Sequence, residues 1–505
     1  MTAKNMLSAP QLQDYLYNEL RDIVKKHHPK ADLSMLDLAY EFALLAHENQ
    51  KRLSGEPYII HPLKTAMTLA QMKLGVPIII AAILHDVPED TSKTLNEISK
   101  EFGPDIASMV SGVTKLGAIK YRGMERYIEN LRKMFIAMAQ DIRVVFIKFA
   151  DRLHNLQTLE YLPTKKRYRI ALETLEIYAP IANRLGMGEI KGQLEDLAFK
   201  YVYPKEYEWT YSAIKQLYGK KKAHLDKAIA QAKKFLAEAG ITPISVHGRR
   251  KHIYSLYKKL ASKDRDVEKV YDLIALRIIV KDLADCYATL GIVHKYWKPL
   301  KGRIKDYIAQ PKPNGYKSLH TTVFLDDGEI IEVQIRTQEI HEEAEYGIAA
   351  HWSYDESGKK SIIPREVRWM QELVKVQKEF ENKKEFLEGL ESLKIDVFRS
   401  RIFVFTPKGD VIDLPEDATP IDFAYAIHSD IGDQCAGAVI NEQIQPLDTP
   451  LKSGDVAHII VNKDRKSPNA DWLKFVKTRA ARTKIKASLN AQSGGWIKKI
   501  LKRDT

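Results

Sequence analysis

The sequence predicts a multidomain protein with an all-α region first, a mixed α/β domain next and a small α+β unit last. Its 505 residues suffice for about three or four domains, each able to bury a core. Apolar residues follow a helical period through residues 1–200. After Gly240 the pattern changes to short β-branched runs, of which Leu273–Val280 is the clearest, and this change indicates a sheet.

The helical elements come first along the chain. Leu36, Tyr40, Ala43 and His47 fall on one helical stripe, and the nine apolar residues Val76–Leu84 are typical of a buried helix. A long charged helix is expected over 211–239, because Gly240 is a common residue just after a helix.

Strands follow in the second half. Beyond Leu273–Val280 they are expected over Thr321–Phe324, Glu329–Thr337, Arg401–Phe405 and Asp410–Leu414, with turns at Asp326–Gly328 and Pro407–Gly409. The chain then divides into a helical domain (1–200), a helical linker (201–240), an α/β domain (241–355), a connecting helix (356–396), an α+β domain (397–463) and a basic helical tail (464–505).

Composition and charge exclude several classes of protein. Cys286 and Cys435 form no paired motif, so we expect neither a disulfide framework nor a thiolate zinc site. The longest apolar run is far shorter than the roughly 20 residues of a membrane span, and residues 1–10 lack a signal-peptide pattern. We therefore expect a cytoplasmic protein without membrane contact. Residues 462–505 carry +10 of the net charge of +13, which points to an anionic partner for that segment alone.

Histidine and aspartate side chains in three separate segments suggest a first site. His61, the pair His85–Asp86 and Asp151 offer two imidazoles and two carboxylates, which suit a borderline-hard divalent ion such as Mn²⁺. Glu89 and Asp90 follow closely, and metal-dependent hydrolysis needs a carboxylate near the attacking water. Taken singly, His61 could cap a turn and Asp151 could pair with Arg152.

The longer strings around these residues are more specific. Arg52–Pro62, His85–Thr91 and Lys148–Asn155 resemble the hydrolase domain of the RelA/SpoT homologues, a member of the HD superfamily. The resemblance implies an all-α HD-type domain that hydrolyses (p)ppGpp with Mn²⁺. It also implies that Arg52, Asn155 and Thr158 contact the guanosine nucleotide.

A second site is indicated in the α/β domain. Along Glu329–Thr337, Glu332, Gln334 and Arg336 point to one side of the strand, away from the apolar residues. Asp272 starts another strand, and two carboxylates on neighbouring strands can hold Mg²⁺. The alternative is a salt-bridged sheet edge. The basic segment Arg303–Thr322 favours polyphosphate binding, because it combines several cations with an aromatic ring and an Asn-Gly turn.

This segment resembles the signature of the RelA/SpoT synthetase domain. The resemblance implies a nucleotidyltransferase-like α/β fold in which Asp272 and Glu332 hold Mg²⁺ and Glu332 helps to deprotonate the ribose 3′-hydroxyl of GDP or GTP. That oxygen would attack the β-phosphorus of ATP and release AMP. The implied nucleotide contacts are Arg249, Lys251, Arg277, Lys305, Lys312, Asn314, Tyr316 and His320. Arg303–Asp306 resembles the basic loop of bifunctional members.

The third domain resembles a TGS domain, a β-grasp module. The strings are Phe403–Asp410 and Asp422–His428, and the resemblance implies contact with the 3′ end of uncharged tRNA, with His428 at a contacting position. An ordinary histidine of a small fold is an equal alternative. The resemblance covers about 30–490, so we expect no zinc-finger or ACT domain before Thr505.

The leading interpretation is a bifunctional (p)ppGpp synthetase and hydrolase that uses ATP, GDP or GTP and (p)ppGpp. Two alternatives remain open. One is a hydrolase whose synthetase domain only senses nucleotides; the other is a ribosome- or tRNA-binding regulator with vestigial chemistry. Intact Asp272, Glu332, His85 and Asp86 argue against both alternatives.

Overall fold

The structure is a computed structural model. It describes residues 9–117, 133–134, 136–138, 140–261, 265–266, 274–312, 314–350, 401–407, 411–452, 455–462, 464–465, 467–478 and 480–489. The chain forms two compact units, Met1–Glu379 and Phe380–Thr505. The connecting helix expected over 356–396 lies outside the described residues.

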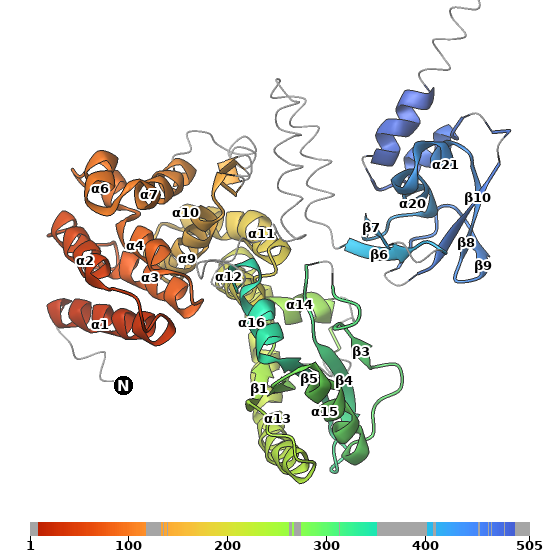
Figure 1. The fold of residues 1–505 in the computed structure, drawn as a ribbon, viewed down its shortest axis with the longest axis horizontal. Coiled ribbons are helices and arrows are strands. Elements are labelled where there is room, and N and C mark those ends of the chain that lie inside the picture. The colour runs from red at the N-terminus through yellow and green to blue at the C-terminus, as the bar shows by residue number, and fades with distance from the viewer. Residues whose placement is uncertain are drawn as a thin grey trace, which may run out of the picture. The chain divides into compact units, whose positions relative to one another are not determined.

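The first half of the first unit is helical, as the sequence predicts (Figure 1). Its elements are α1 (Ala9–His27), α2 (Ser34–Ala46), α3 (Ile60–Gln71), α4 (Val76–Leu84), α5 (Val87–Asp90), α6 (Leu95–Phe102), α7 (Pro104–Gly117), α9 (Arg143–Gln157), η2 (Leu159–Tyr161), α10 (Thr164–Glu173), the π-helical η3 (Thr174–Tyr178), α11 (Ala179–Arg184) and α12 (Gly188–Val202).

Local sequence explains why several of these helices begin and end where they do. α4 coincides with the predicted apolar run, and Ile78–Leu84 is buried throughout. The stripe Leu36, Tyr40, Ala43 and His47 is also buried. A capping box between Thr94 and Glu97 starts α6, since each residue satisfies a backbone or side-chain group of the other.

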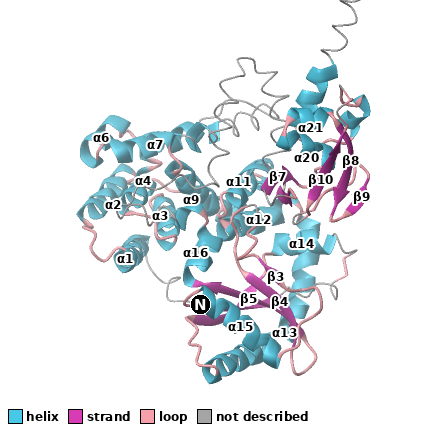
Figure 2. Ribbon diagram, turned by 45° about the vertical axis from the view of Figure 1, so that its right-hand side comes forward, coloured by secondary structure: helices cyan, strands magenta, loops and turns pink. Residues whose placement is uncertain are grey.

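The second half of the first unit is built on a five-stranded sheet of order β1-β2-β5-β4-β3. Figure 2 labels its strands β3, β4 and β5. β2 and β5 are parallel, and the other neighbours are antiparallel. The elements are α13 (Pro204–Glu238), β1 (Ser245–Arg250), α14 (Ile253–Ala261), β2 (Ile274–Val280), α15 (Leu283–Tyr296), β3 (Lys305–Asp306), β4 (Leu319–Phe324), β5 (Ile330–Thr337) and α16 (Gln338–Tyr346).

One face of this sheet is apolar and covered by helices. Leu276, Ile278, Val333 and Ile335 form a core with residues of α13 and α15. The segment 201–240, which we expected to be a linker, therefore belongs largely to this core: α13 contributes Ala228, Ala232 and Leu236, all nearly inaccessible to solvent. The helix is long because it both leaves the helical first half and covers the sheet.

The two halves of the first unit are in direct contact. α12 packs on α9 as well as on α14 and α16. Lys73, in the loop between α3 and α4, forms an ion pair of 2.6 Å with Glu342 on α16. Gly347 has a φ of +58°, and a Cβ there would collide with the carbonyl oxygen of Leu185, so glycine permits this close approach.

The second unit contains a hairpin, two short helices and a three-stranded sheet. The elements are β6 (Arg401–Phe405), β7 (Val411–Pro415), α20 (Pro420–Ile427), α21 (Ser429–Asp433), β8 (Cys435–Ile440), β9 (Gln443–Gln445), β10 (Ala457–Val461) and η5 (Ala470–Lys474), with sheet order β10-β8-β9. The predicted hairpin over Arg401–Leu414 is confirmed, although residues 408–410 of its turn lie outside the described residues.

The segment after this sheet is not a detached tail. Trp472, Val476, Ala481 and Ile485 are buried in the same core as Phe423 of α20. The Asp422 carboxylate accepts hydrogen bonds from the main-chain N–H groups of Lys477 and Thr478, 55 and 56 residues further along. Residues beyond 463, as far as Leu489, therefore pack on the core of this small fold. Within the described residues, no helix is long and apolar enough to span a membrane.

Candidate functional sites

Three helices bring the predicted metal ligands together. His61 lies in the first turn of α3, His85 and Asp86 follow the last residue of α4, and Asp151 lies in the middle of α9. α3 packs on both α4 and α9 through apolar residues. Because the helices are held by this packing, the four polar side chains project into one buried place.

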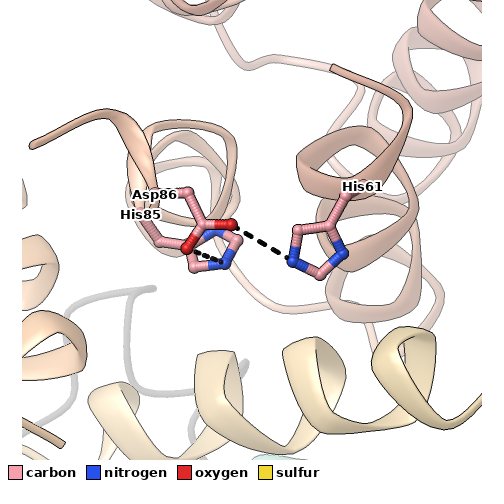
Figure 3. Close-up of side chains that lie close together, drawn as sticks. All are labelled: His61, His85 and Asp86. Atoms are coloured by element: carbon pink, nitrogen blue, oxygen red, sulfur yellow. Dashed lines mark ion pairs between the residues drawn. The ribbon is translucent and has the colours of Figure 1, made fainter. Parts of the chain in front are cut away.

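Three of these side chains, His61, His85 and Asp86, form a compact cluster (Figure 3), and Asp151 lies beside His61. The His61 Nε2 atom lies 3.3 Å from Asp86 Oδ2 and 3.2 Å from Asp151 Oδ1, and His85 Nε2 lies 3.1 Å from Asp86 Oδ1. His61, His85 and Asp151 are at least 96% buried. The sequence prediction of one site from three distant segments is consistent with this geometry.

The electrostatics of the cluster suit a cation. Burial alone would lower the pKa of His61, but hydrogen bonds to Asp151 and Asp86 raise it, so the site stabilises positive charge. His85 Nδ1 donates to the Ala82 carbonyl at 2.8 Å, which leaves Nε2 turned towards Asp86. That buried Nε2 has no hydrogen-bond partner among the described residues. A buried imidazole nitrogen that faces the Asp86 carboxylate without a hydrogen bond to it fits a divalent metal ion.

Residues expected to bind the nucleotide lie next to the cluster. Arg52 donates to Asn155 Oδ1 at 2.6 Å and lies 3.1 Å from His154 Nδ1. The Asn155 amide in turn donates to Asp151. Thr158 instead ends α9, where its hydroxyl lies 3.4 Å from the His154 carbonyl. The structure thus joins Asn155 to the cluster directly and Arg52 through Asn155 and His154, whereas Thr158 contacts only the backbone of α9.

The two acidic residues after the cluster differ in environment. Asp90 accepts a hydrogen bond of 2.5 Å from the Tyr58 hydroxyl, which lies 3.0 Å from Asp86 Oδ2 as well. The pKa of Glu89 is raised, first by desolvation and then by the negative charge of Asp86. A carboxyl group with a raised pKa is suited to proton transfer near neutral pH.

The polar face of the five-stranded sheet carries the second site. Lys305, His320, Gln334, Arg277 and His247 lie side by side, one on each strand, in a single row. A second row holds Arg249, Ala275, Glu332 and Thr322, each two residues along its strand from the first row. Because side chains two apart share a face, both rows face the same side.

A chain of hydrogen bonds crosses this face and ends at Glu332. Arg336 Nη2 lies 2.5 Å from the Tyr316 hydroxyl, which lies 2.8 Å from His320 Nε2; His320 Nδ1 then lies 2.5 Å from Glu332 Oε1. A direct ion pair between Glu332 and Arg336, as a salt-bridged sheet edge would require, is not among the contacts of Arg336 in the described residues. Arg336 instead contacts Ser318, Gln334, Tyr316 and Glu345.

Cations gather around the loop before β4. The Lys312 ammonium lies 4.8 Å from the centre of the Tyr316 ring. Partial desolvation by the surrounding protein, together with the positive charges of Lys305, Lys251 and Arg249, lowers the pKa of Lys312 to about 8, although its residue surface remains substantially exposed. Such mutual repulsion needs an anion to relieve it, and polyphosphate is an anion of that size.

The remaining predicted residues are placed less directly. Asn314 lies in the turn before Tyr316, and its Oδ1 atom accepts a hydrogen bond of 3.4 Å from the Tyr316 N–H. Asp272 lies outside the described residues, although Ala275, three residues later, pairs with Glu332 in the sheet. His428 caps α21 through the N–H of Asp430, and 64% of its side chain is exposed.

Sequence reasoning missed residues that hold others in place. In the first site these are Tyr58, Lys148, which contacts Asp151 at 2.7 Å, and His154. In the second site the missed residue is Glu345, which lies 2.7 Å from Arg277. Tyr58, Lys148 and His154 all lie inside the strings quoted above, whereas no local signal marks Glu345, which reaches the sheet only through the packing of α16.

Protein-family models match the chain in three consecutive regions. They are described as an HD domain over residues 39–188, a region found in RelA/SpoT proteins over 248–359, and a TGS domain over 402–461. A GTP pyrophosphokinase of Myxococcus xanthus is 44% identical over 500 residues, which cover 96% of this chain and 65% of that protein. The bifunctional (p)ppGpp synthase/hydrolase SpoT of Escherichia coli (strain K12) is 46% identical over 493 residues, which cover 97% and 68%.

A solved structure described as that of a metazoan ortholog of SpoT that hydrolyses ppGpp matches with 28% identity and a TM-score of 0.23, over 26% of this chain and 73% of that one. A match with so low a TM-score has no bearing on the function of this chain.

The fold and sites define a protein that joins an HD domain to a cation-lined α/β domain and a TGS domain. The chain belongs to the RelA/SpoT family and spans about two thirds of the length of the two curated relatives above.

Proposed function

We propose that the chain is a bifunctional enzyme of the stringent response, with (p)ppGpp synthetase and (p)ppGpp 3′-pyrophosphohydrolase activity in one compact unit. The observation that carries the proposal is the presence of two separate polar sites. One is the buried His61–His85–Asp86 cluster beside Arg52, and the other is the polar sheet face around Glu332. Family membership supports both assignments.

The first site supports hydrolysis. His61, His85, Asp86 and Asp151 would hold Mn²⁺, which when bound would supply a Lewis acid for cleavage of the 3′-pyrophosphate. Arg52, held by Asn155 at 2.6 Å, presents a planar cation to the nucleotide. Glu89 and Asp90 would orient the attacking water and carry its proton, with the raised pKa of Glu89 as support.

The second site supports pyrophosphoryl transfer from ATP. Glu332 takes the proton of the 3′-hydroxyl of GDP or GTP, and that oxygen attacks the β-phosphorus of ATP, with AMP as the leaving group. Lys251, Lys305 and Lys312 neutralise charge on the phosphates, and His320 is a further phosphate contact. Arg249 and Arg277, on the sheet, would stack on the adenine ring. Asp272 and Glu332 would hold Mg²⁺, an ion that prefers carboxylate oxygen.

The second unit supports an interaction with RNA. Its TGS domain and the basic segment 462–505 are proposed to contact uncharged tRNA and the ribosome, with His428 as one exposed contact. We place the enzyme in the cytoplasm, where its nucleotide substrates are found.

The test is a pair of incubations followed by nucleotide chromatography. The chain is incubated with ATP, GDP and Mg²⁺, and separately with ppGpp and Mn²⁺. We expect AMP and ppGpp in the first and GDP with pyrophosphate in the second. Hydrolysis without synthesis would leave a nucleotide-sensing synthetase domain, and neither activity would leave an RNA-binding regulator.

A further inference from the structure

His154 contacts residues of the first site but has no role in the hydrolysis proposed above. It lies on α9 three residues after Asp151, is 7% exposed, and touches two residues with separate roles. His154 Nδ1 lies 2.8 Å from His61 Nδ1 and 3.1 Å from Arg52 Nη1. This inference rests on the proposed hydrolase, and it concerns how that site is held ready for metal.

The direction of these hydrogen bonds follows from Arg52. A guanidinium group donates hydrogen bonds and cannot accept them. His154 Nδ1, which faces it, must therefore act as an acceptor, and a proton there would set two donors against each other. The His61–His154 bond must then have its proton on His61 Nδ1.

The consequence falls on the other nitrogen of His61. With the proton held on Nδ1, the neutral ring carries its lone pair on Nε2, the atom that lies 3.3 Å from Asp86 and 3.2 Å from Asp151. We propose that His154 is a positioning residue that fixes the metal-binding tautomer of His61 and anchors Arg52 through the same nitrogen.

His85 shows the same arrangement with a different acceptor. Its Nδ1 donates to the main-chain carbonyl of Ala82, and its Nε2 faces Asp86. A backbone acceptor cannot be removed by substitution, whereas the acceptor for His61 is a side chain. Partners that orient metal-ligating histidines in this way usually contribute strongly to metal affinity.

Two substitutions of nearly equal shape separate the acceptor from the packing. In His154→Asn the Oδ1 atom stands the same number of bonds from Cα as Nδ1, so an acceptor remains. In His154→Leu a methyl group takes that place. Mn²⁺ affinity is measured without nucleotide by calorimetry and by the loss of the aqueous Mn²⁺ electron paramagnetic resonance signal. Thermal unfolding confirms that both variants are folded.

We expect His154→Leu to weaken Mn²⁺ binding by roughly 10- to 100-fold and His154→Asn to stay within about threefold of the wild type. Equal affinity of the Leu variant and the wild type would overturn the inference, as would an equal loss in both variants, which would indicate packing alone. If the wild type bound no Mn²⁺ and His85→Ala gave the same result, the proposed metal site itself would be wrong, rather than the role of His154.

Discussion

The Glu332 carboxylate lies at the end of a hydrogen-bond chain that starts at Arg336. Arginine can only donate and an ionised carboxylate can only accept. The Tyr316 hydroxyl therefore accepts from Arg336 and donates to His320 Nε2, and His320 Nδ1 donates to Glu332. Desolvation lowers the pKa of His320, which favours the neutral ring that this direction requires. Glu332 is thus oriented by residues that need no change of protonation during binding.

Glu332→Gln isolates the charge of this residue. The amide oxygen can still accept from His320, so the strand and the hydrogen-bond chain persist. We expect synthesis to fall by at least ~10²-fold, because a group that assists proton transfer is lost, while ppGpp hydrolysis continues. Glu339→Gln, an exposed change at the start of α16, is the control. Unchanged synthesis would make Glu332 a structural residue of the sheet.

Asp86→Asn tests the other site. It removes a carboxylate that lies within 3.3 Å of both His61 and His85. We expect ppGpp hydrolysis to be abolished and synthesis to remain, because Glu332 lies in the other half of the unit. Asp32→Asn, on an exposed loop of the same half, should affect neither rate. Chromatography of both reactions decides; hydrolysis near the wild-type rate would contradict the ligand assignment.

Lys312 should make ATP binding depend on pH. Its pKa is lowered to about 8, and the protonated form is the one that binds phosphate. Affinity is therefore fully present well below pH 8, is about halved at pH 8, and falls by roughly another fivefold between pH 8 and 9. Lys312→Arg stays charged throughout and should flatten this part of the KM profile. Identical profiles for the two proteins would exclude Lys312 as the source.

At the level of residues, the sequence predicts site residues that lie within continuous motifs. It does not predict contacts between residues that are far apart in the chain. His61, His85, Asp86 and Asp151 each sit in a recognisable segment, and their ligand chemistry predicts that they meet. The link from Arg277 to Glu345 joins residues 68 positions apart. Only the packing of α16 beside the sheet brings them together, and no periodicity or local composition encodes that approach.

Among the elements, α13 departs most from its prediction. The sequence correctly predicts a long helix that ends before Gly240, because charged residues and a glycine stop are local signals. It does not predict what the helix covers, because Ala228 and Ala232 are small and the stripe that they form looks weakly apolar. Small side chains nevertheless allow a helix to lie close to a sheet, and both are buried.

Leu236→Ala tests whether α13 belongs to the core. Leu236 is 1% exposed, so we expect a loss of about 2–5 kcal/mol in the free energy of unfolding of the first unit. Lys233→Ala, on the exposed side of the same helix, should change it little. The measurement is the urea midpoint followed by circular dichroism. Equal urea midpoints for the two variants would show that α13 does not contribute to the core and acts as a linker.

For the molecule as a whole, charge is distributed unevenly. Residues 462–505 carry +10 of the total +13, and part of that segment is built into the second unit. Deletion of the segment would remove Trp472 and Ile485 from a core, so loss of RNA binding by a truncated chain would be ambiguous. Substitution of exposed basic residues avoids this difficulty.

The triple variant Lys474→Ala, Arg482→Ala, Lys486→Ala should bind tRNA more weakly. Each lost phosphate contact should reduce the slope of log affinity against log salt by roughly 0.7–0.9. The matched control removes the same net charge from α13, through Lys227→Ala, Lys233→Ala and Lys234→Ala. Filter binding at two salt concentrations compares them. Equal slopes for both triple variants would show that only overall charge matters.

The single helix α13 imposes a rule on how chains of this kind can change in length. Its earlier part packs through Ile214 against Leu256 and Leu260, and its later part packs through Ala232 and Leu236 against the sheet. One inserted residue between these parts would rotate the later contacts by about 100° around the axis and turn charged residues into the core. An insertion of seven residues, close to two full turns, would nearly restore the facing. Natural insertions and deletions should therefore avoid the middle of this helix and collect in the loops around it. The sequences of distant relatives should then align without gaps through the middle of α13, although its charged sequence contains no recognisable motif.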